Sequence, residues 1–524
     1  MCISFKLVKE IIHMAANTIV HNNTKRENET TVRRFLGWQT ALFCLVLLAL
    51  LLLGILMRLH DLGLPFDRDS YDEGVYWQSL RAMSAGHALY QSIFYSQPPF
   101  FMFSIFPTYL FSGQSLWAAR LGIALVSMLG LLGAFLLGKA LSGRVGAIAA
   151  LLLIIVDPLY LAQSQTIQAE APSTALSLLA IGAAYLWWEH PEGVAGICYA
   201  IVAALTLSLS IFCKLLAVST LVPIGLLMLA HIWRMRSGKH IMGLDALLLG
   251  ISVFLACSAL LIVPFMNSLP QAWQGVVTFH TTAGSILKSS QPSNAKQLEH
   301  LLITLTSCAA LFGTLAALLR RDWRVVPLLA WFLVTVYLLW QQTPLFPHHL
   351  VALTPPLVGL AVIGIGPLPL SKQRPAVLIN IATGISLLLI LVTAVLNGQA
   401  DQHYYYAMRQ QNAAGATQQQ LQVAKDLQSV TRPDQLVVTD AQFLAALANR
   451  STPAPLVDTS LVRIQTGYLT AQQLIQQVQQ PEVHAVLFYT GRINASNVSA
   501  FRQWVTHHLH RVHSYGNGKE LWIK

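Results

Sequence analysis

Charged residues are scarce in this sequence. Of its 524 residues only 10% are Asp, Glu, Lys or Arg, whereas 55% are hydrophobic, and the mean hydropathy is +0.55. Soluble domains carry roughly a quarter charged residues, so most of the chain cannot face water. Apolar runs of about 20 residues, long enough to cross a bilayer, recur between Trp38 and Asn397. The composition therefore predicts an α-helical membrane protein with many spans.

Cysteine pairs with disulfide or metal-ligand spacing are also lacking. The sequence has six cysteines but no CxxC pair, and five of the six lie in or at the ends of apolar runs. We therefore predict neither disulfides nor a cysteine-bound metal. A Gly-rich phosphate loop is missing as well, so the sequence contains no nucleotide-binding motif.

The net charge of +11 does not indicate nucleic-acid binding. The basic residues sit mainly in short loops between apolar runs, not in a stripe with interleaved aromatics. Such a distribution is typical of charges that set membrane topology.

Eleven spans put the basic loops on one side of the membrane. With the tail (1–37) inside, the outer connections beyond the first loop hold only Lys214, Lys288 and Lys296 as basic residues. This asymmetry predicts a multi-pass plasma-membrane protein with a cytoplasmic N-terminus and an outer C-terminus. The predicted spans are 38–57, 116–138, 145–161, 171–188, 194–212, 215–233, 242–266, 298–319, 325–341, 349–368 and 376–397.

Three outer segments are too long to be simple connections. Residues 58–115 hold many charges and aromatics, with short helices such as Glu73–Ala85 lying along the interface. Residues 267–297 form a polar loop that we interpret as a flap over a site. Residues 401–524, beyond the membrane module 38–400, form a small extracytoplasmic α/β domain. In it we predict a helix over 411–430 and buried strands at Gln435–Asp440 and His484–Thr490.

Asp72-Glu73 is the first candidate for chemistry. Two adjacent carboxylates just beyond a span are costly to hold near an apolar surface, and a raised pKa there suits a general base. An acidic turn, or favourable charges in the first turn of a helix, explains the pair equally well.

Other polar groups lie at the predicted outer ends of spans. Glu170 opens the fourth span, where a carboxylate at membrane depth indicates function but also suits a helix start next to Pro172. Lys214 either snorkels to the interface or binds an anion such as phosphate. His348 and His349 are interfacial or donate to a phosphate or hydroxyl, and without a third ligand nearby in sequence a zinc site is weakly supported. The topology places all of these groups and Asp72 on one face, which favours a single site.

In order along the chain, these motifs resemble the GT-C superfamily of polytopic glycosyltransferases, which use lipid-phosphate sugars. The chain is most similar to the aminoarabinose-transferase-like and protein-O-mannosyltransferase-like branch. The resemblance covers about residues 38–400. It rests on Asp72-Glu73-Gly74-Val75-Tyr76, Arg81, Gly86-His87-Ala88-Leu89-Tyr90, Gln97-Pro98-Pro99, Glu170, Lys214 and the segment "HHLVALTPPL" from His348.

The resemblance implies an inverting glycosyltransferase that moves a sugar from a polyprenyl phosphate to an acceptor hydroxyl on a lipid, glycan or protein. Asp72 would be the base, with Glu73 and Glu170 as further acidic groups. Lys214, His348 and His349 would bind the donor phosphate. Glu170 would either position the acceptor or hold a divalent cation, Mg²⁺ or Mn²⁺, and no metal ligands are assigned. The substrate loop would contain Tyr76, Arg81, Tyr90, Gln97, Pro98 and Pro99, with Gln97 standing where relatives often have His or Lys.

Three other functions are alternatives to a glycosyltransferase, and each would show a different feature. An oligosaccharide transferase or ligase would need a large acceptor site in the outer domain. A transporter would place charges in broken helices at the midplane and show repeated halves, which this sequence does not. A scaffold without catalysis would tolerate replacement of Asp72.

Overall fold

The computed structural model describes residues 26–69, 71–236, 243–287, 291–366 and 374–524. The chain divides into two compact units, residues 1–49 and 50–524. In the first unit only the beginning of helix α2 (Arg26–Leu59) is described, and residues 1–25 of the predicted tail lie outside the described residues. All the described helices and strands after α2 belong to the second unit.

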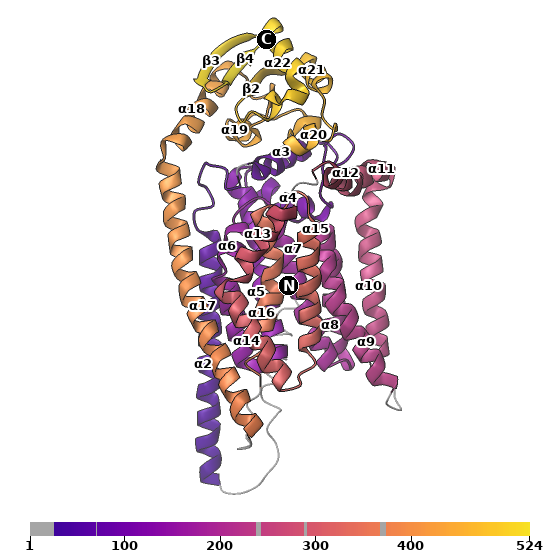
Figure 1. Ribbon diagram of the computed structural model, residues 1–524, viewed down its shortest axis with the longest axis vertical. Helices are drawn as coiled ribbons and strands as arrows, with labels where there is room; N and C mark the ends of the chain where they lie inside the picture. The colour runs from indigo at the N-terminus through magenta and orange to yellow at the C-terminus, as the bar shows by residue number, and fades with distance from the viewer. Residues whose placement is uncertain (1–25, 70, 237–242, 288–290, 367–373) are drawn as a thin grey trace. The chain divides into compact units, whose positions relative to one another are not determined.

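The second unit is mostly helical, as predicted (Figure 1). Each of the eleven predicted spans overlaps a helix. By length and composition six described helices are able to cross a membrane, or seven if one bent pair, α13 with α14, is a single span. The number eleven therefore stays a prediction. This unit includes the helices α6 (Pro158–Gln163), α8 (Gly193–Cys213), η1 (Leu215–Thr220), α9 (Leu221–Arg236), α10 (Leu244–Ile262), α14 (Leu305–Leu319), α15 (Val325–Gln341), η5 (Pro347–Leu353) and α16 (Thr354–Ile363).

Helix α5 (Leu116–Ile155) combines two predicted spans, 116–138 and 145–161. Its backbone leaves helical geometry at Ser142 and Gly143, which lie between the two predicted segments. Gly143 has φ +63° and ψ −147°, a conformation that glycine adopts easily because it has no Cβ. The expected loop is thus a sharp kink between two helical stretches.

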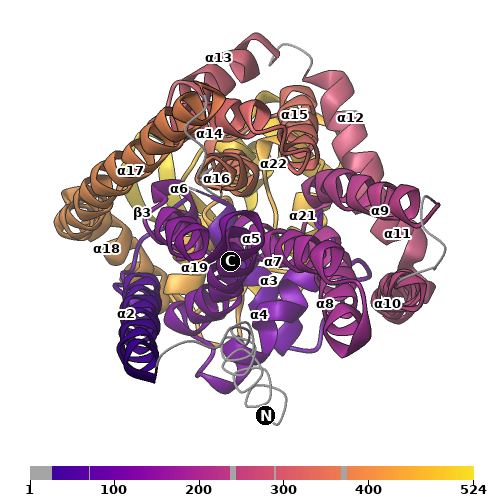
Figure 2. The ribbon, with the colours of Figure 1, turned by 90° about the horizontal axis from the view of Figure 1, so that it is seen from below.

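Helix α7 (Glu170–Glu189) packs closely along α5 because glycines remove the side chains between them. A Cβ added at Gly133 would lie 2.4 Å from the backbone nitrogen of Leu179, and one added at Gly182 would lie 2.7 Å from the Gly133 oxygen. Small residues at such contacts are typical of membrane helices, whose association depends on close packing. Figure 2 shows α5 and α7 near the centre of the helices, so this contact places Glu170 inside the bundle.

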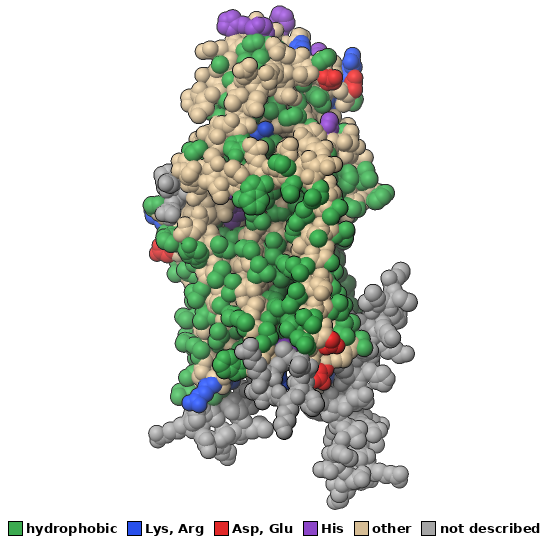
Figure 3. Space-filling model, turned by 90° about the vertical axis from the view of Figure 1, so that its right-hand side faces the viewer, with side chains coloured by type: hydrophobic (Ala, Val, Ile, Leu, Met, Phe, Trp, Pro, Cys, Tyr) green, Lys and Arg blue, Asp and Glu red, His purple; other side chains and the backbone are tan. Residues whose placement is uncertain are grey.

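Hydrophobic side chains cover the outer face formed by α8, α9 and α10 (Figure 3). Leu229, Trp233 and Leu260 are 63%, 80% and 71% exposed. An apolar surface of this extent would be unfavourable in water and is the surface expected to face lipid.

The segment 267–297 is not the loop that the sequence predicted. Apart from residues 288–290, which lie outside the described residues, it is largely helical. The polar composition concealed an apolar face, on which Phe279 and Ala283 are buried four residues apart, and the Phe279 ring packs 5.5 Å from Phe94 of the first outer loop. Its elements are η2 (Val263–Ser268), α11 (Leu269–Trp273), the π-helical η3 (Gln274–Thr278), α12 (Phe279–Ile286) and α13 (Gln291–Leu302).

The predicted α/β domain is present at the C-terminal end. Helix α17 (Arg374–Ala413) runs through the predicted boundary at 400/401, and α18 (Gly415–Val430) confirms the helix expected after it. Both predicted strands are confirmed as β1 (Leu436–Thr439) and β2 (Val483–Phe488). The other elements are α19 (Gln442–Leu447), η6 (Ala454–Leu456), α20 (Leu461–Gln465), α21 (Ala471–Gln479), η7 (Arg492–Asn494), η8 (Ser496–Val498), α22 (Ser499–His508), β3 (His510–Gly516) and β4 (Lys519–Ile523).

The sheet has the strand order β1-β2-β4-β3, and its strands β1 and β2 are largely buried, whereas the edge strand β3 is largely exposed. β1 and β2 are parallel, and β4 runs antiparallel to β2 and β3. Alternate side chains of a strand point to opposite faces, so Val438 and Val486 join a core with α21 and α22. Val437 and Leu487 join a second core with α18 and α19. The short apolar strands are therefore explained by helices on both sides of the sheet.

Candidate functional site

Asp72 and Glu73 are the first two residues of α3 (Asp72–Ser84). Carboxylates are favoured in the first turn because they interact with the positive end of the helix dipole. The predicted helix is confirmed, and it separates the two carboxylates, since successive residues project about 100° apart around a helix.

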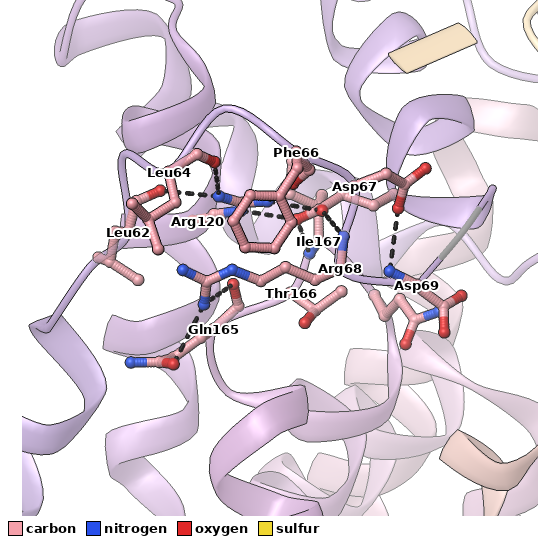
Figure 4. A network of polar contacts seen from close by, with 12 residues as sticks. Leu62, Leu64, Phe66, Asp67, Arg68, Asp69, Arg120, Gln165, Thr166 and Ile167 are labelled. Carbon is pink, nitrogen blue, oxygen red and sulfur yellow. Dashed lines mark hydrogen bonds and ion pairs between the residues drawn. The ribbon is translucent and has the colours of Figure 1, made fainter. Parts of the chain in front are cut away.

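Glu73 is fully buried in an ion pair with Arg120 of α5. Figure 4 shows the network of polar contacts around Arg120. Arg120 Nε donates to Glu73 Oε1 at 2.8 Å, and Nη2 donates to Oε2 at 2.7 Å. Each oxygen also accepts a backbone N–H, from Ile167 at 3.1 Å and from Arg68 at 2.9 Å. Burial raises the pKa of Glu73, but Arg120 outweighs burial, so the pKa lies below its usual value.

The remaining hydrogen atoms of Arg120 hold the loop before α3. Its guanidinium donates to the carbonyl oxygens of Leu62, Leu64 and Phe66 at 2.8 to 3.0 Å. Arg68, from the same loop, donates to both oxygens of Gln165, at 3.2 and 3.1 Å. Glu73 and Arg120 therefore join the first outer loop to α5 and to the segment that precedes α7.

Asp72 has a different environment. It is partly exposed, and among the described residues none donates a hydrogen bond to its carboxylate. One of its oxygens lies within 4.8 Å of both an Asp69 oxygen and a His348 ring nitrogen. Burial, and then the neighbouring Asp69 carboxylate, raise the pKa of Asp72 to about 7.

Asp69 connects Asp72 to the second half of the chain. His348 Nδ1 lies 3.0 Å from Asp69 Oδ1, and Gln168 Nε2 donates to Oδ2. The opposite ring nitrogen of His348 lies 3.6 Å from Glu170. A ring from η5 thus lies between the carboxylates of the first loop and the start of α7.

Glu170 and Lys214 form a buried ion pair. Lys214 has extended backbone at the break between α8 and η1, so the helix ends where the ammonium group meets the carboxylate. His349 Nε2 lies 3.7 Å from the same Glu170 oxygen. Beside them is a pocket whose lining includes the hydroxyl groups of Ser173, Ser177, Ser219 and Thr220.

Residues 83–281 match the family model for dolichyl-phosphate-mannose-protein mannosyltransferases. The structure of ArnT from Cupriavidus metallidurans bound to undecaprenyl phosphate is similar over 93% of this chain and 98% of that chain, with a TM-score of 0.63 and 15% identity. Archaeal AglB from Archaeoglobus fulgidus, an oligosaccharyltransferase in complex with an inhibitory peptide and a dolichol-phosphate, is similar over 89% and 71%, with a TM-score of 0.50 and 15% identity. No curated protein sequence matches significantly.

The chain has the GT-C fold. The resemblance predicted from its motifs is therefore confirmed at the level of the fold. In this GT-C chain, Asp72, Glu170, Lys214, His348 and His349 lie in one continuous cluster, as the predicted topology required. The chemical roles assigned to them stay predictions.

The residues predicted for the substrate loop lie in several places. Tyr76 packs edge-on against Phe101, and the Tyr90 hydroxyl donates to the Gln97 carbonyl at 2.6 Å. Pro98 precedes Pro99, which is the N-terminal cap of α4 (Phe100–Phe111). Arg81 instead donates to Ser451 and Asn449, so its side chain is anchored to the C-terminal domain.

Sequence reasoning missed several groups of this site. Arg120 had a signal, because it is a single basic residue near the start of an apolar run, where a charge indicates function. The Nε2 atom of His280 lies 2.8 Å from the carbonyl oxygen of Ser96. Asp458 accepts a hydrogen bond from the Tyr71 hydroxyl at 3.2 Å. Neither has a sequence signal, because the partners are far apart along the chain.

Replacement Glu73→Gln tests the buried ion pair. It leaves the Arg120 charge buried without its anion, which typically costs about 3–5 kcal/mol. We expect a clear drop in the midpoint of thermal unfolding in detergent and a lower yield of folded protein. Glu482→Gln makes the same chemical change at an exposed side chain of the C-terminal domain and should leave the midpoint nearly unchanged. An equal midpoint for both variants would contradict this structural role.

Proposed function

We propose that this chain is a glycosyltransferase of the plasma membrane, which transfers a sugar from a polyprenyl phosphate to an acceptor hydroxyl at the outer face. The observation that carries the proposal is the position of Asp72. Its carboxylate has no described hydrogen-bond donor, and it lies in the same cluster as the cationic and imidazole groups of Lys214, His348 and His349. The match to the mannosyltransferase family model over 83–281 supports this reaction class.

Asp72 is suited to act as the base. A carboxylate whose pKa burial raises to about 7 accepts a proton more readily than an ordinary aspartate near neutral pH. It removes the proton of the acceptor hydroxyl while the acceptor oxygen attacks the anomeric carbon. The bond between that carbon and the phosphate oxygen breaks, and the electron pair leaves with the polyprenyl phosphate. Attack opposite to the leaving group inverts the anomeric centre.

Lys214 is suited to stabilise the leaving phosphate. Cations that are already in place where negative charge develops contribute strongly to catalysis, because the site does not have to reorganise. Glu170 holds the ammonium group in position, and His348 and His349 add hydrogen-bonding groups next to it. ArnT of similar fold was solved with undecaprenyl phosphate, which agrees with this kind of donor.

An apolar groove is available for the lipid chain. It lies between α13 and α15, has a volume of about 500 Å³, and is lined by Leu298, Leu302, Leu333 and Trp340 among others. Asn294 donates to the Trp340 carbonyl at 3.1 Å, which ties α13 to the end of α15. The chain continues from there to the His348-His349 pair, so a lipid tail in the groove would be near the proposed phosphate site.

Glu73 receives a different role from the one the resemblance implied. Both of its oxygens are occupied by Arg120 and by backbone N–H groups, and it is fully buried. We therefore propose that Glu73 holds the loop in place and that Asp72 alone is the base.

Replacement Asp72→Asn should abolish transfer while preserving the fold. Membrane vesicles containing the protein are given labelled polyprenyl-phosphate sugars, and label in endogenous acceptors is measured. We expect at least a 100-fold loss, because a general base typically contributes about 10²- to 10⁴-fold to the rate. Asp434→Asn, at an exposed aspartate, is the matched control and should retain wild-type transfer. Equal transfer by wild type and Asp72→Asn, or label moved across the membrane without a new glycosidic bond, would overturn the proposal.

Replacement Lys214→Met should reduce turnover roughly 100-fold, as expected for loss of a group that stabilises transition-state charge. Because the single variant leaves Glu170 buried without its partner, Lys214→Met with Glu170→Gln serves as a charge-balanced variant. It should remain defective although its yield recovers. Lys425→Met, at an exposed lysine of α18, is the matched control. If the charge-balanced variant had wild-type kcat and KM, Lys214 could not be the group that binds the leaving phosphate.

The divalent cation expected from the sequence stays a prediction. Asp69, Asp72 and His348 offer three ligand atoms within 4.8 Å of one another, and so do Glu170, His348 and His349. In the second group, the Lys214 ammonium already forms an ion pair with Glu170, so the first group is better suited to bind a cation. Carboxylate ligands favour Mg²⁺ or Mn²⁺, and the imidazole favours Mn²⁺ of the two. If transfer is lost in EDTA and returns with Mn²⁺, the ion is used; unchanged transfer in EDTA excludes it.

A further inference from the structure

Helix α3 is held from two sides. Its Glu73 side is fixed to α5 by Arg120, and Tyr76 packs against Phe101 of α4. The other side lies directly beneath the C-terminal domain (Figure 1), and it carries Tyr71, Gly74, Gln78 and Arg81 at helical spacing. The helix that begins with Asp72 is therefore packed against α5, α4 and the C-terminal domain.

Gln78 is completely occupied by the C-terminal domain. It is 1% exposed, and its Nε2 donates to the carbonyl oxygens of Gln442 and Arg450 at 3.2 and 3.0 Å. Its Oε1 accepts the N–H of Thr452 at 3.2 Å. An amide that forms three hydrogen bonds with the backbone of another domain fixes both the distance and the rotation of the helix that carries it.

Gly74 allows the two backbones to touch. A Cβ at this position would lie 2.4 Å from the backbone nitrogen of Phe443 at the start of α19, too close for any side chain without movement of the backbone. The neighbouring Trp77 ring packs edge-on against Phe443, with centroids 5.4 Å apart. The glycine of the Asp-Glu-Gly-Val-Tyr motif is thus required by the C-terminal domain.

Tyr71, the residue before Asp72, makes the third attachment. Its hydroxyl donates to Asp458 at 3.2 Å and accepts the N–H of Thr459 at 2.6 Å. The guanidinium of Arg492 lies over its ring, with its central carbon 4.0 Å from the centroid. The residues on either side of Asp72 are therefore anchored to different parts of the molecule.

We infer that the C-terminal domain positions Asp72 for transfer, and that Gly74 and Gln78 are the positioning residues through which it acts. This inference rests on the proposed function of Asp72 as the base. The physical reason is that α3 is attached to α5 through Glu73 and to the C-terminal domain through Gly74 and Gln78, which lie on different faces of the helix. A shift of the helix against the C-terminal domain moves the Asp72 carboxylate relative to Lys214 and His348, which belong to other elements. A misplacement of about 1 Å is sufficient to reduce catalysis about 100-fold.

The test compares Gly74→Ala and Gln78→Ala with two matched controls in the full-length protein. Gly398→Ala adds a methyl group to a helical glycine with open space around it, and Gln91→Ala truncates an exposed glutamine of the same outer loop. We expect at least a tenfold fall in kcat for Gly74→Ala and Gln78→Ala. Their binding of unlabelled polyprenyl phosphate should change less than twofold, because Lys214, His348 and Glu170 are not moved. Both controls should retain wild-type values.

Hydrogen exchange provides a second readout that does not depend on activity. Amides of α3 should exchange faster in the two test variants, whereas those of β2 should remain protected. If Asp72→Asn is inactive but Gly74→Ala and Gln78→Ala turn over within twofold of wild type, the inference fails and the proposed function stands. If Asp72→Asn is active, the proposed function fails. Unchanged protection of α3 in Gly74→Ala would overturn the positioning role even without a transfer assay, as would a loss of polyprenyl-phosphate binding equal to the loss of kcat.

Discussion

The buried ion pair between Glu73 and Arg120 connects the parts of this molecule that form the candidate site. Arg120 comes from a long membrane helix, Glu73 from the first turn of α3, and their other hydrogen bonds hold the loop before α3 and the segment before α7. Two charges removed from water are tolerated only when every polar atom has a partner. That requirement explains why so many backbone groups converge on one pair, and why the loop has one defined path.

The carboxylates near this pair differ in their electrostatic surroundings, because each has different hydrogen-bond and ion-pair partners. Glu73 has a guanidinium and backbone donors, Glu170 has an ammonium group, and Asp69 has an imidazole and an amide. Asp72 alone among these four has no described donor, although it is close to Asp69 and His348. A group that is surrounded by protein, near a like charge and without a donor retains its proton more strongly. The same arrangement leaves its oxygens available to a substrate hydroxyl.

The C-terminal domain belongs to this site as much as the membrane helices do. Gln442, Arg450 and Thr452 present backbone groups to the amide of Gln78, and Phe443 is in backbone contact distance of Gly74. Such interactions depend on the position of the backbone and not on the identity of the side chains of the domain.

The sequence by itself determined the helical membrane class, the two buried strands of the C-terminal domain and the gathering of Asp72, Glu170, Lys214 and the two histidines. These features depend on local composition: apolar runs, alternation over short stretches, and basic residues in particular loops. The kink at Gly143, the helices within 267–297 and the different surroundings of Asp72 and Glu73 were decided only by the tertiary structure. Adjacent carboxylates look equivalent in a sequence, and it is Arg120, 47 positions away, that pairs with Glu73 and leaves Asp72 without a donor among the described residues.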